Sequence, residues 1–502
     1  MTQQIGHLID GEQLNDGLTT QPVYNPATGE VCAELAMASP KVVEQAIASA
    51  KQAYPAWSAT APAARAQVMY RFKQLLEQNQ DKICELITLE HGKVLSDAKG
   101  ELARGIENVE YACGIPELLK GEHSRNVGTN IDAWSEFHAL GVVVGITPFN
   151  FPAMVPLWMW PSAIMCGNCF ILKPSERDPS SALYIAELAH QAGLPKGVLN
   201  VVNGGVDVVN QLIDAPAVQA VSFVGSTPIA EAIYERSASQ GKRCQALGGA
   251  KNHAVILPDA DLDVVTNSLM GAAFGSCGQR CMAISVAVTV GDKVADALVA
   301  KLAPKVEALN VGPGTDNSNE MGPIITGAQK QKVIGYIDQA IEQGASLVVD
   351  GRTKSVPQYE AGFFLGGTLF DNVTPEMTIY QQEVFGPVLV VVRVESLEQA
   401  VRLINEHEYG NGTCIFTRDG EAGRYFSDHV MVGMVGINVP LPVPVSYHSF
   451  GGWKRSLFGD LHAYGPDSVR FYTRRKAITQ RWPSRGVQDG TQFSFPSYSE
   501  DD

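Results

Sequence analysis

Apolar residues recur at helical spacing in two long stretches near the start of the chain. In Lys41–Trp57 and Pro62–Gly92 they lie three and four positions apart, which is typical of helices that bury one face. The same pattern predicts a helix over Ala98–Cys113. Ahead of these helices, turn dipeptides at Asp10-Gly11 and Asn25-Pro26 predict two hairpins.

The stretch Ala139–Leu172 contains no Lys, Arg, Asp or Glu and resembles a membrane span in its apolarity. Four prolines and two asparagines interrupt it, however, so we interpret it as buried strands around a helix. The expected elements are a strand over Gly141–Thr147, a loop over Pro148–Pro152, a helix, and a second strand over Cys169–Lys173. Continuous apolar strands of this kind are typical of a parallel sheet that is covered on both faces.

Short apolar strands then alternate with amphipathic helices, which predicts an α/β fold with a parallel, doubly wound sheet. The expected strands are Phe170–Lys173, Leu199–Val202 and Ala220–Val224, and the expected helices are Ser181–Ala192, Val206–Ile213 and one after Thr227. Asp259 is expected to cap a helix that runs to Ala273. A second series of strands and helices is expected from Ile284 to about Phe416. The polar, acidic segment Gly486–Asp502 is expected to be disordered or to lie over a neighbouring chain.

The chain is long and acidic. Its 502 residues are too many for a single hydrophobic core, so we expect two or more domains. A formal net charge of −15 argues against nucleic acid or an anionic membrane as the main partner. The nine cysteines follow no disulfide spacing and the first residues carry no visible secretory signal. Free thiols in a reducing, cytoplasmic compartment are therefore expected.

A candidate nucleophile ends the sequence Ser276-Cys277-Gly278-Gln279-Arg280-Cys281. Glycine lets the backbone turn tightly, and the neighbouring Arg280 could favour the thiolate of Cys281, which is the reactive form. Cys277 and Cys281 could instead bind a metal, but no second Cys or His pair at metal spacing lies nearby, so no metal site is expected. A lone cysteine could also be a small buried hydrophobe.

Several motifs stand in the order found in the aldehyde dehydrogenase superfamily, which the chain resembles from roughly Leu8 to Trp482. Pro148-Phe149-Asn150-Phe151-Pro152 resembles the loop with the oxyanion-hole asparagine, and Leu172-Lys173-Pro174-Ser175-Glu176 the segment that holds the adenosine ribose. Phe223-Val224-Gly225-Ser226-Thr227 resembles the pyrophosphate turn, and Glu383-Val384-Phe385-Gly386-Pro387 the nicotinamide-ribose motif. Leu247-Gly248-Gly249 resembles the turn beside the catalytic base. Cys281 falls where the family places its nucleophile.

The resemblance implies catalysis through a thioester on Cys281. Attack of a thiolate on an aldehyde creates an oxyanion, which needs fixed hydrogen-bond donors. By resemblance these are the side-chain amide of Asn150 and the backbone N–H of Cys281. Taken alone, Asn150 could equally be a turn residue that caps its own loop. The thiohemiacetal then passes hydride to a nicotinamide, which leaves the thioester.

The implied cofactor is NAD, and its pyrophosphate is expected at the start of a helix. Gly225 ends a strand, Ser226 and Thr227 are candidate caps, and Pro228 suits the first helical position. A helix N-terminus attracts phosphate through its free N–H groups and its dipole. The usual later glycine of the family is Ala230 here, so the pyrophosphate placement is expected to differ slightly.

The ribose groups of NAD have their own implied partners. Lys173 and Glu176 would bond the adenosine ribose, and the carboxylate would repel a 2′-phosphate, which favours NAD over NADP. These two residues could instead form a solvated ion pair. Glu383 would hold the nicotinamide ribose, or could merely face solvent, and the neighbouring motifs add Phe149 and Phe385 to the implied cofactor site.

One departure from the family narrows the expected reaction. Most hydrolytic members carry glutamate just before Leu-Gly-Gly, where it activates water, but this chain has Ala246 there. Alanine cannot accept a proton, and neither can the neighbouring Gln245, so attack of water on the thioester should be slow. A partly ionised thiol needs less help, which predicts coenzyme A as the acyl acceptor.

Further segments resemble the methylmalonate-semialdehyde dehydrogenase branch of the family. They are Arg104–Glu110, Pro156–Met159, Gly248–His253, Gly278–Met282 and Phe450–Lys454. The branch implies oxidation of malonate or methylmalonate semialdehyde with decarboxylation to acetyl-CoA or propionyl-CoA, with Arg104 and Arg280 holding the substrate carboxylate. Arg104 could instead pair with Glu101 or Glu107 on a helix surface, and Arg280 could be a structural bridge. The main rival is a hydrolytic semialdehyde dehydrogenase that releases a free acid, and a catalytically silent protein on the same fold is a further alternative.

The resemblance also implies a domain organisation. We expect an NAD-binding domain at 1–121 and 139–247, a catalytic domain at 248–446, and a small β oligomerisation element at 122–138 and 447–482, followed by a tail at 483–502. Within that element, strands are expected over Glu122–His138 and Tyr464–Trp482. A homotetramer or homodimer follows from the resemblance, and small molecules are the only other partners expected.

Overall fold

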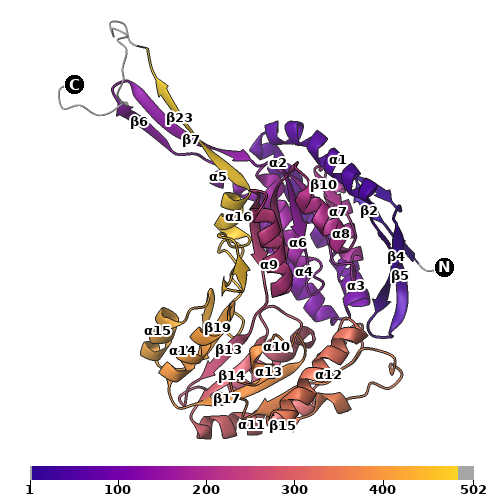
Figure 1. Cartoon of the computed structure of the whole chain (residues 1–502), viewed down its shortest axis with the longest axis vertical. Coiled ribbons are helices and arrows are strands. Elements are labelled where there is room, and N and C mark those ends of the chain that lie inside the picture. Colours follow the sequence, from indigo (N-terminus) through magenta and orange to yellow (C-terminus); the bar gives the residue numbers. More distant parts are fainter. Residues whose placement is uncertain (1–2, 484–502) are drawn as a thin grey trace.

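The computed structural model describes residues 3–483, which form two α/β bodies and a projecting β-arm (Figure 1). The upper body in Figure 1 contains the first half of the chain, and the lower body contains most of the second half. Each body has a large hydrophobic core of its own. The predicted Gly486–Asp502 tail lies outside the described residues.

An eight-stranded sheet forms the centre of the upper body, in the order β22-β12-β11-β8-β9-β10-β2-β3. Its five middle strands are parallel, as the alternating pattern predicted. Every residue of β8 and β9 is buried, and because successive side chains point to opposite faces, both faces of the sheet are covered. The strands are β2 His7–Ile9, β3 Glu12–Leu14, β8 Val142–Ile146, β9 Cys169–Lys173, β10 Leu199–Val201, β11 Val218–Val224, β12 Arg243–Leu247 and β22 Leu457–Phe458.

Nine helices of the described chain belong to this first half. They are α1 Pro40–Ala59, α2 Pro62–Gln78, α3 Gln80–His91, α4 Leu95–Cys113, α5 Ile115–Leu118, α6 Met154–Met165, α7 Ser180–Gln191, α8 Val206–Asp214 and α9 Thr227–Ala238. The stretch Pro62–Gly92 is helical as its spacing predicted, but it forms two helices, because α2 ends and α3 begins around Asn79. The Asn79 side chain donates to the Leu75 carbonyl at 2.8 Å and accepts from the Tyr184 hydroxyl at 2.7 Å. Asparagine commonly competes with helical bonds in this way.

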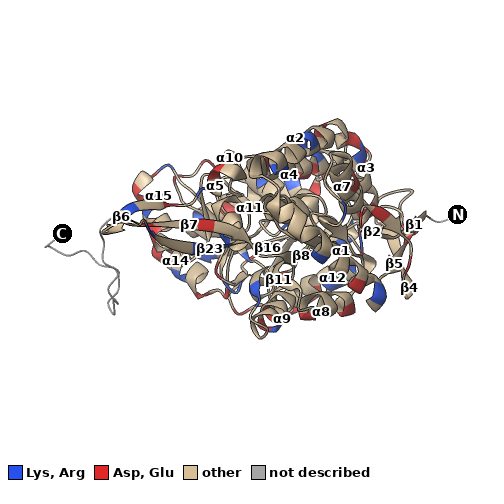
Figure 2. Cartoon of the chain, turned by 90° about the horizontal axis from the view of Figure 1, so that it is seen from above, with Lys and Arg blue, Asp and Glu red and all other residues tan. Residues whose placement is uncertain are grey.

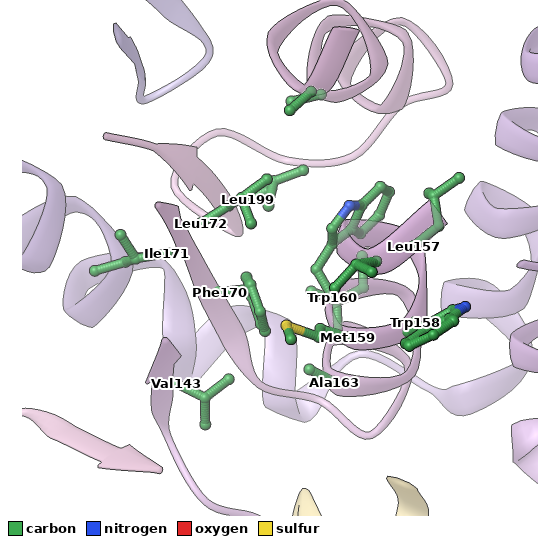
Figure 3. Close-up of a cluster of buried hydrophobic side chains, with 14 of the residues drawn as sticks. Val143, Leu157, Trp158, Met159, Trp160, Ala163, Phe170, Ile171, Leu172 and Leu199 are labelled. Carbon is green, nitrogen blue, oxygen red and sulfur yellow. The ribbon is translucent and has the colours of Figure 1, made fainter. Parts of the chain in front are cut away.

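The apolar run that resembled a membrane span lies inside the upper body. All twelve residues of α6 are buried, and Figure 3 shows its large side chains, among them Leu157, Met159 and Trp160, beside strand residues such as Phe170 and Leu172. Among the described residues, no helix combines the length and apolarity that crossing a membrane requires. The strand-loop-helix-strand interpretation of this run is therefore confirmed.

A seven-stranded sheet, β15-β16-β17-β14-β13-β19-β20, forms the centre of the lower body. Its strands are β13 Asn252–Ile256, β14 Ile284–Val290, β15 Ser346–Val349, β16 Thr368–Asp371, β17 Val388–Val394, β19 Gly412–Phe416 and β20 Met434–Ile437. The helices of this half are α10 Leu262–Phe274, α11 Asp292–Glu307, α12 Gly327–Glu342, α13 Thr378–Gln381, α14 Leu397–Glu406, α15 Gly420–His429 and, towards the arm, α16 Gly465–Phe471. Asp261, and not Asp259, caps α10. Asp259 instead accepts from the Thr417 hydroxyl and the Arg418 backbone N–H, which ties it to the loop after β19.

The projecting arm is a three-stranded antiparallel sheet in the order β23-β7-β6 (Figure 1). Its strands are β6 His123–Gly128, β7 Ile131–Ala139 and β23 Thr473–Arg481. The expected strand Tyr464–Trp482 was therefore too long, because its first part forms the helix α16, with Pro466 in the first turn. Residues 447–482 also supply β22 to the eight-stranded sheet, so this range does not belong to the arm alone.

Two small sheets complete the described chain. One has the order β1-β5-β4, with β1 Gln3–Ile5, β4 Thr19–Asn25 and β5 Glu30–Met37, and the other pairs β18 Tyr409–Gly410 with β21 Trp453–Lys454. The turns at Asp10-Gly11 and after Asn25 confirm both predicted hairpins. Charged residues of both signs are interspersed over the outer helices in Figure 2.

Candidate active site

A pocket of about 550 Å³ lies at the carboxyl ends of strands β8, β9 and β11. The chain runs from β8 to β9 and β10 on one side and then returns to place β11 on the other side of β8. Ligands of doubly wound sheets bind where the strand order reverses in this way. Every predicted catalytic and cofactor-binding residue lines this pocket: Phe149, Asn150, Lys173, Glu176, Gly225, Ser226, Cys281, Glu383 and Phe385.

The loop between β8 and α6 carries Asn150 into the pocket. This residue is 3% exposed, and within residues 3–483 its side-chain amide bonds no protein group. A turn residue that capped its own loop would bond that loop, so the structure contradicts this alternative. The amide is therefore available to a ligand that enters beside Cys281.

Lys173 and Glu176 form an ion pair in the pocket wall, with 2.8 Å between Nζ and Oε2. Lys173 is only 5% exposed, so the pair is not the solvated one that the sequence left open. Although burial opposes ionisation, Lys173 and the backbone N–H of Glu176 hold the pKa of this carboxyl below its usual value. Both groups can bond ribose hydroxyls, and the negative charge of Glu176 disfavours a nearby phosphate.

The first turn of α9 faces the same pocket. Pro228 lies in this turn as predicted, and a side chain at Gly225 would approach the Phe223 ring to 2.4 Å. Ser226 occupies the cap position, but its side chain bonds no helix N–H, and the Thr227 hydroxyl accepts from Gly249 at 2.8 Å instead. The expected side-chain cap is thus absent from this described helix. Pro228 has no N–H, and the N–H groups of Ile229 and Ala230 donate to the Ser226 carbonyl, so the N–H groups of Ser226 and Thr227 are the ones left for an anion.

The nucleophile candidate follows a strained turn. Ser276 and Cys277 have φ values of 51° and 56°, and Gly278 has a φ of 67°. A Cβ at Gly278 would lie 2.1 Å from the Gly386 carbonyl oxygen, so only glycine fits there. The turn delivers Cys281 to a fixed position, because the amide of Asn252 donates to its carbonyl oxygen at 2.9 Å. The amide of Asn411 donates to the same oxygen at 3.0 Å.

Burial determines the state of the thiol. Cys281 keeps partial access to the pockets, yet the surrounding protein excludes enough water to raise its pKa to about 12. The carboxyl of Glu383 adds to this rise, whereas Arg280 lowers the pKa only slightly. Arg280 thus favours the thiolate in the expected direction, but burial and Glu383 outweigh it, and its guanidinium pairs with Asp97 at 2.7 Å.

Glu383 faces the pocket and not bulk solvent. Its carboxyl accepts from the Ala250 backbone N–H at 3.0 Å, and burial raises its pKa to about 7. The neighbouring Phe385 has a φ of 54° and meets the Phe149 ring edge-on, with 5.9 Å between centroids. These two rings join the loops of the two bodies across the pocket.

A second pocket, of about 200 Å³, also reaches Cys281 and is lined by both predicted substrate clamps, Arg104 and Arg280. Arg104 pairs with Glu107 at 2.7 Å and donates to the Val443 and Pro444 carbonyls. The surface ion pair that the sequence left open thus exists. The Arg104 guanidinium still lines the pocket, so its ion pair with Glu107 is compatible with a role as a clamp for the substrate carboxylate. Ser96, Asp97 and Glu101 also line this pocket, and most of the remaining wall is apolar, including Phe151, Met154, Trp158, Met282 and Phe450.

Ala246, which stands where hydrolytic family members carry the catalytic glutamate, is fully buried. Ala246 lies in β12, where it pairs with Phe223 and Phe458, and it lines neither of these two pockets. The adjacent Gln245 is held by the Ser222 hydroxyl at 3.0 Å and the Leu461 carbonyl at 2.9 Å. Neither residue therefore presents a base to a thioester on Cys281.

The other candidate roles are structural. Cys277 is 1% exposed, and burial raises the pKa of its thiol. Within residues 3–483, the His, Cys, Asp and Glu side chains gather nowhere in a group that could hold a metal ion. His253 is fully buried, and its ring nitrogen lies 3.0 Å from the Tyr380 hydroxyl, which agrees with a satisfied core histidine.

A sequence model of the aldehyde dehydrogenase family matches residues 14–478. The chain belongs to this family. It is 68% identical over 491 residues to the malonate-semialdehyde dehydrogenase of Pseudomonas aeruginosa, covering 98% of this chain and 99% of that protein. It is 48% identical to the malonate-semialdehyde dehydrogenase of Halalkalibacterium halodurans, covering 96% of this chain and 99% of that protein.

Solved structures of this aldehyde dehydrogenase family agree closely with the fold. The methylmalonate-semialdehyde dehydrogenase of Oceanimonas doudoroffii has a TM-score of 0.96 and 67% sequence identity, covering 97% of this chain and 99% of that one. A Sinorhizobium meliloti protein assigned the same enzyme name, and solved with NAD, has a TM-score of 0.95 and 53% identity, covering 96% and 99%. The predicted family, branch resemblance and fold class are confirmed.

In this aldehyde dehydrogenase, three charged residues that the sequence analysis did not assign to the site surround it. Lys93 and Glu101 form a buried ion pair at 2.7 Å behind the Asn150 loop, and Asp97 binds Arg280. From the sequence, Glu101 was considered only as an ion-pair partner of Arg104 on a helix surface. The sequence carried no signal for this ion pair, because other charged residues stand close to both Lys93 and Glu101, and only the fold shows that both are buried and require partners.

Proposed function

We propose that this aldehyde dehydrogenase oxidises malonate or methylmalonate semialdehyde with NAD and transfers the decarboxylated acyl group to coenzyme A. The observation that carries the proposal is the position of Cys281 where two pockets meet. One pocket holds ribose- and phosphate-binding features, and the other holds Arg104 and Arg280. The names of the relatives in Pseudomonas aeruginosa and Oceanimonas doudoroffii support this substrate class.

The chain supplies the groups for acylation. The Arg104 and Arg280 guanidiniums hold the carboxylate of the semialdehyde, which orients its aldehyde carbon towards Cys281. The Cys281 thiol gives its proton to solvent and its sulfur attacks that carbon, while the Asn150 amide and the Cys281 backbone N–H stabilise the oxyanion. NAD, when bound, supplies the hydride acceptor, so the thiohemiacetal becomes a thioester. Lys173, Glu176 and Glu383 would hold its ribose groups.

Glu176 determines the proposed choice of cofactor. Its carboxylate is ionised beside Lys173, and a 2′-phosphate on the ribose would be repelled by this charge. The Sinorhizobium meliloti relative was solved with NAD, which supports the same preference. The first turn of α9 would bind the pyrophosphate through its free N–H groups.

Decarboxylation uses the same oxyanion donors. Loss of CO2 from the β-carboxylate leaves its electron pair on the α-carbon, conjugated with the thioester carbonyl. The oxygen of that enolate lies where Asn150 donates, and a proton completes the acetyl or propionyl thioester. The thiolate of coenzyme A then attacks the carbonyl carbon, and the Cys281 sulfur leaves. Water cannot compete, because Ala246 offers no base.

The test follows NADH formation from both semialdehydes with NAD, in the presence and absence of coenzyme A. We expect steady turnover with coenzyme A and a single stoichiometric burst without it. The Cys281→Ala variant should lose the burst, and the matched control Cys32→Ala, which removes a distant thiol, should keep it. Sustained turnover without coenzyme A would establish the hydrolytic alternative instead.

A further inference from the structure

The start of helix α4 carries two carboxylates on one face. Asp97 and Glu101 are four positions apart, so their side chains lie one above the other along the helix. Lys93 lies just before the helix and reaches back to Glu101, with 2.7 Å between Nζ and Oε2. The side chains of Lys93 and Glu101 are 1% and 0% exposed, so water does not satisfy their charges. Their partners must therefore come from the protein.

Lys93 and Glu101 hold the loop that carries Asn150, Lys93 at Asn150 itself and Glu101 at the end of the loop. The Lys93 ammonium donates to the Asn150 carbonyl oxygen at 2.7 Å and lies 4.5 Å from the centre of the Phe151 ring. The second oxygen of Glu101 accepts from the Ala153 backbone N–H at 2.8 Å and from the next N–H, that of Met154, at 3.1 Å. The start of α6, which has no side-chain cap of its own, is thus bound by a carboxylate from α4.

Asp97 holds the other catalytic segment. One of its oxygens accepts from the backbone N–H of Ser276, at 2.9 Å, and the other from Arg280, at 2.7 Å. Ser276 has a positive φ and begins the turn that ends at Cys281. A single carboxylate therefore bonds both the start of the nucleophile turn and the residue directly before the thiol.

The backbone before α4 also contacts the second body. The Leu95 N–H donates to the Gly314 carbonyl at 3.1 Å, and a Cβ on Gly314 would lie 2.3 Å from the Lys93 carbonyl oxygen. A Cβ on Gly322 would lie 2.1 Å from the Gly92 carbonyl oxygen. This close approach of main chains fixes the segment that carries Lys93 against the catalytic half of the molecule.

We propose that Lys93, Asp97 and Glu101 are positioning residues that set the distance between the Asn150 amide and the Cys281 sulfur. Within residues 3–483 they bond neither the Asn150 amide nor the Cys281 sulfur, and they act through the two loops, with Asp97 also holding Arg280. The inference rests on the proposed function, because it needs Asn150 as the oxyanion donor and Cys281 as the nucleophile. A small displacement of such groups lowers a rate by roughly a hundredfold.

The first experiment is a double-mutant cycle on the rate of the NADH burst. The Asn150→Ala variant alone should lose roughly a hundredfold to a thousandfold, as expected for an oxyanion donor. In the wild-type background, Glu101→Gln should lower the burst rate by roughly tenfold to a hundredfold. In the Asn150→Ala background it should lower the burst rate by about twofold or less, because the oxyanion donor that Glu101 positions is already absent. Equal losses in both backgrounds would overturn the role of Glu101.

The second experiment separates the two loops by the rate at which iodoacetamide alkylates Cys281. Alkylation needs the sulfur in place but no oxyanion donor. We therefore expect Glu101→Gln to leave this rate unchanged and Asp97→Asn to lower both alkylation and the burst. Loss of alkylation in both variants, or in neither, would contradict the division between the loops. Lys99→Ala is the matched control, because this exposed lysine on α4 pairs with the exposed Asp81 at 3.5 Å.

Folding is checked by circular dichroism before each assay. If Glu101→Gln does not fold, Lys93→Arg replaces it in the same cycle, because it keeps the charge and moves the donor. The two proposals fail in different ways. A wild-type enzyme without a burst, or a Cys281→Ala variant that keeps it, refutes the proposed function. A normal wild-type burst with additive losses in the cycle refutes only the positioning role.

Discussion

The Cys281 thiol must ionise before it attacks a carbonyl carbon, and burial raises its pKa to about 12. Below this pKa the thiolate fraction grows about tenfold with each pH unit. Alkylation of the free enzyme by iodoacetamide should therefore accelerate about tenfold per unit from pH 7 to 9, without a plateau. Mass spectrometry of the peptide that contains Cys281 gives the rate, and the buried Cys277 should stay unlabelled. A plateau in this range would show that a neighbouring cation such as Arg280 stabilises the thiolate.

Ala246 determines the acyl acceptor in the proposed cycle. The Ala246→Glu variant should add a general base and raise steady NADH formation without coenzyme A by roughly tenfold or more. It should also lower the free energy of unfolding, because the site is fully buried. Ala246→Gln is the control, since it has the same size and no basic group. An equal rise in both variants would mean that altered packing, not a base, admits water.

At the scale of elements, the nucleophile turn depends on one glycine. The Gly278→Ala variant would place a methyl group 2.1 Å from the Gly386 carbonyl oxygen and would force alanine to a φ of 67°. The left-handed conformation alone costs about 1–2 kcal/mol, so thermal unfolding should shift downwards and the burst should disappear. Gly335→Ala is the matched control. Gly335 is exposed within α12 with open space around it, so alanine should stabilise the helix by about 0.5–1 kcal/mol.

Strands and helices with a continuous hydrophobic pattern were predictable from the sequence. Helix ends that depend on the hydrogen bonds of one side chain were not. The apolar strands β8 and β9 and the helix between them follow from hydrophobicity alone, because both faces of the sheet are covered. The helix break at Asn79 and the helix cap at Asp261 depend on which side-chain hydrogen bonds form. In the sequence, Asp259 is as good a cap candidate as Asp261.

The same distinction applies to the site. The motif residues were identified because their order along the chain resembles a family, and the structure brings them to one pocket. The charge state of Cys281 was not predictable, because Arg280 is adjacent in sequence but pairs with Asp97, more than 180 residues away along the chain. Lys93 and Glu101 were missed for a related reason, since their burial is a property of the packed loops.

At the scale of the whole molecule, the projecting arm ends in an edge strand that is a candidate surface for binding another chain. Among residues 3–483, β23 pairs with β7 over nine residues and stands at the edge of this sheet, a position at which strands of separate chains commonly pair. The strand contains Arg474, Arg475 and Lys476 in a chain with a net charge of −15. An acidic surface would complement these cations, and a second copy of this chain offers one.

We therefore expect the protein to form a homodimer or homotetramer, which light scattering during size-exclusion chromatography would detect as a multiple of 53.9 kDa. The Ala477→Pro variant should lower this mass, because proline removes a backbone N–H and distorts the middle of β23, at an exposed position far from the pockets. Ala477→Thr, which suits a strand, should keep the wild-type mass. A wild-type monomer at micromolar concentration would refute the oligomer. An unchanged mass in Ala477→Pro would place the interface on another surface, and the arm would then need a different explanation for its projection from the body.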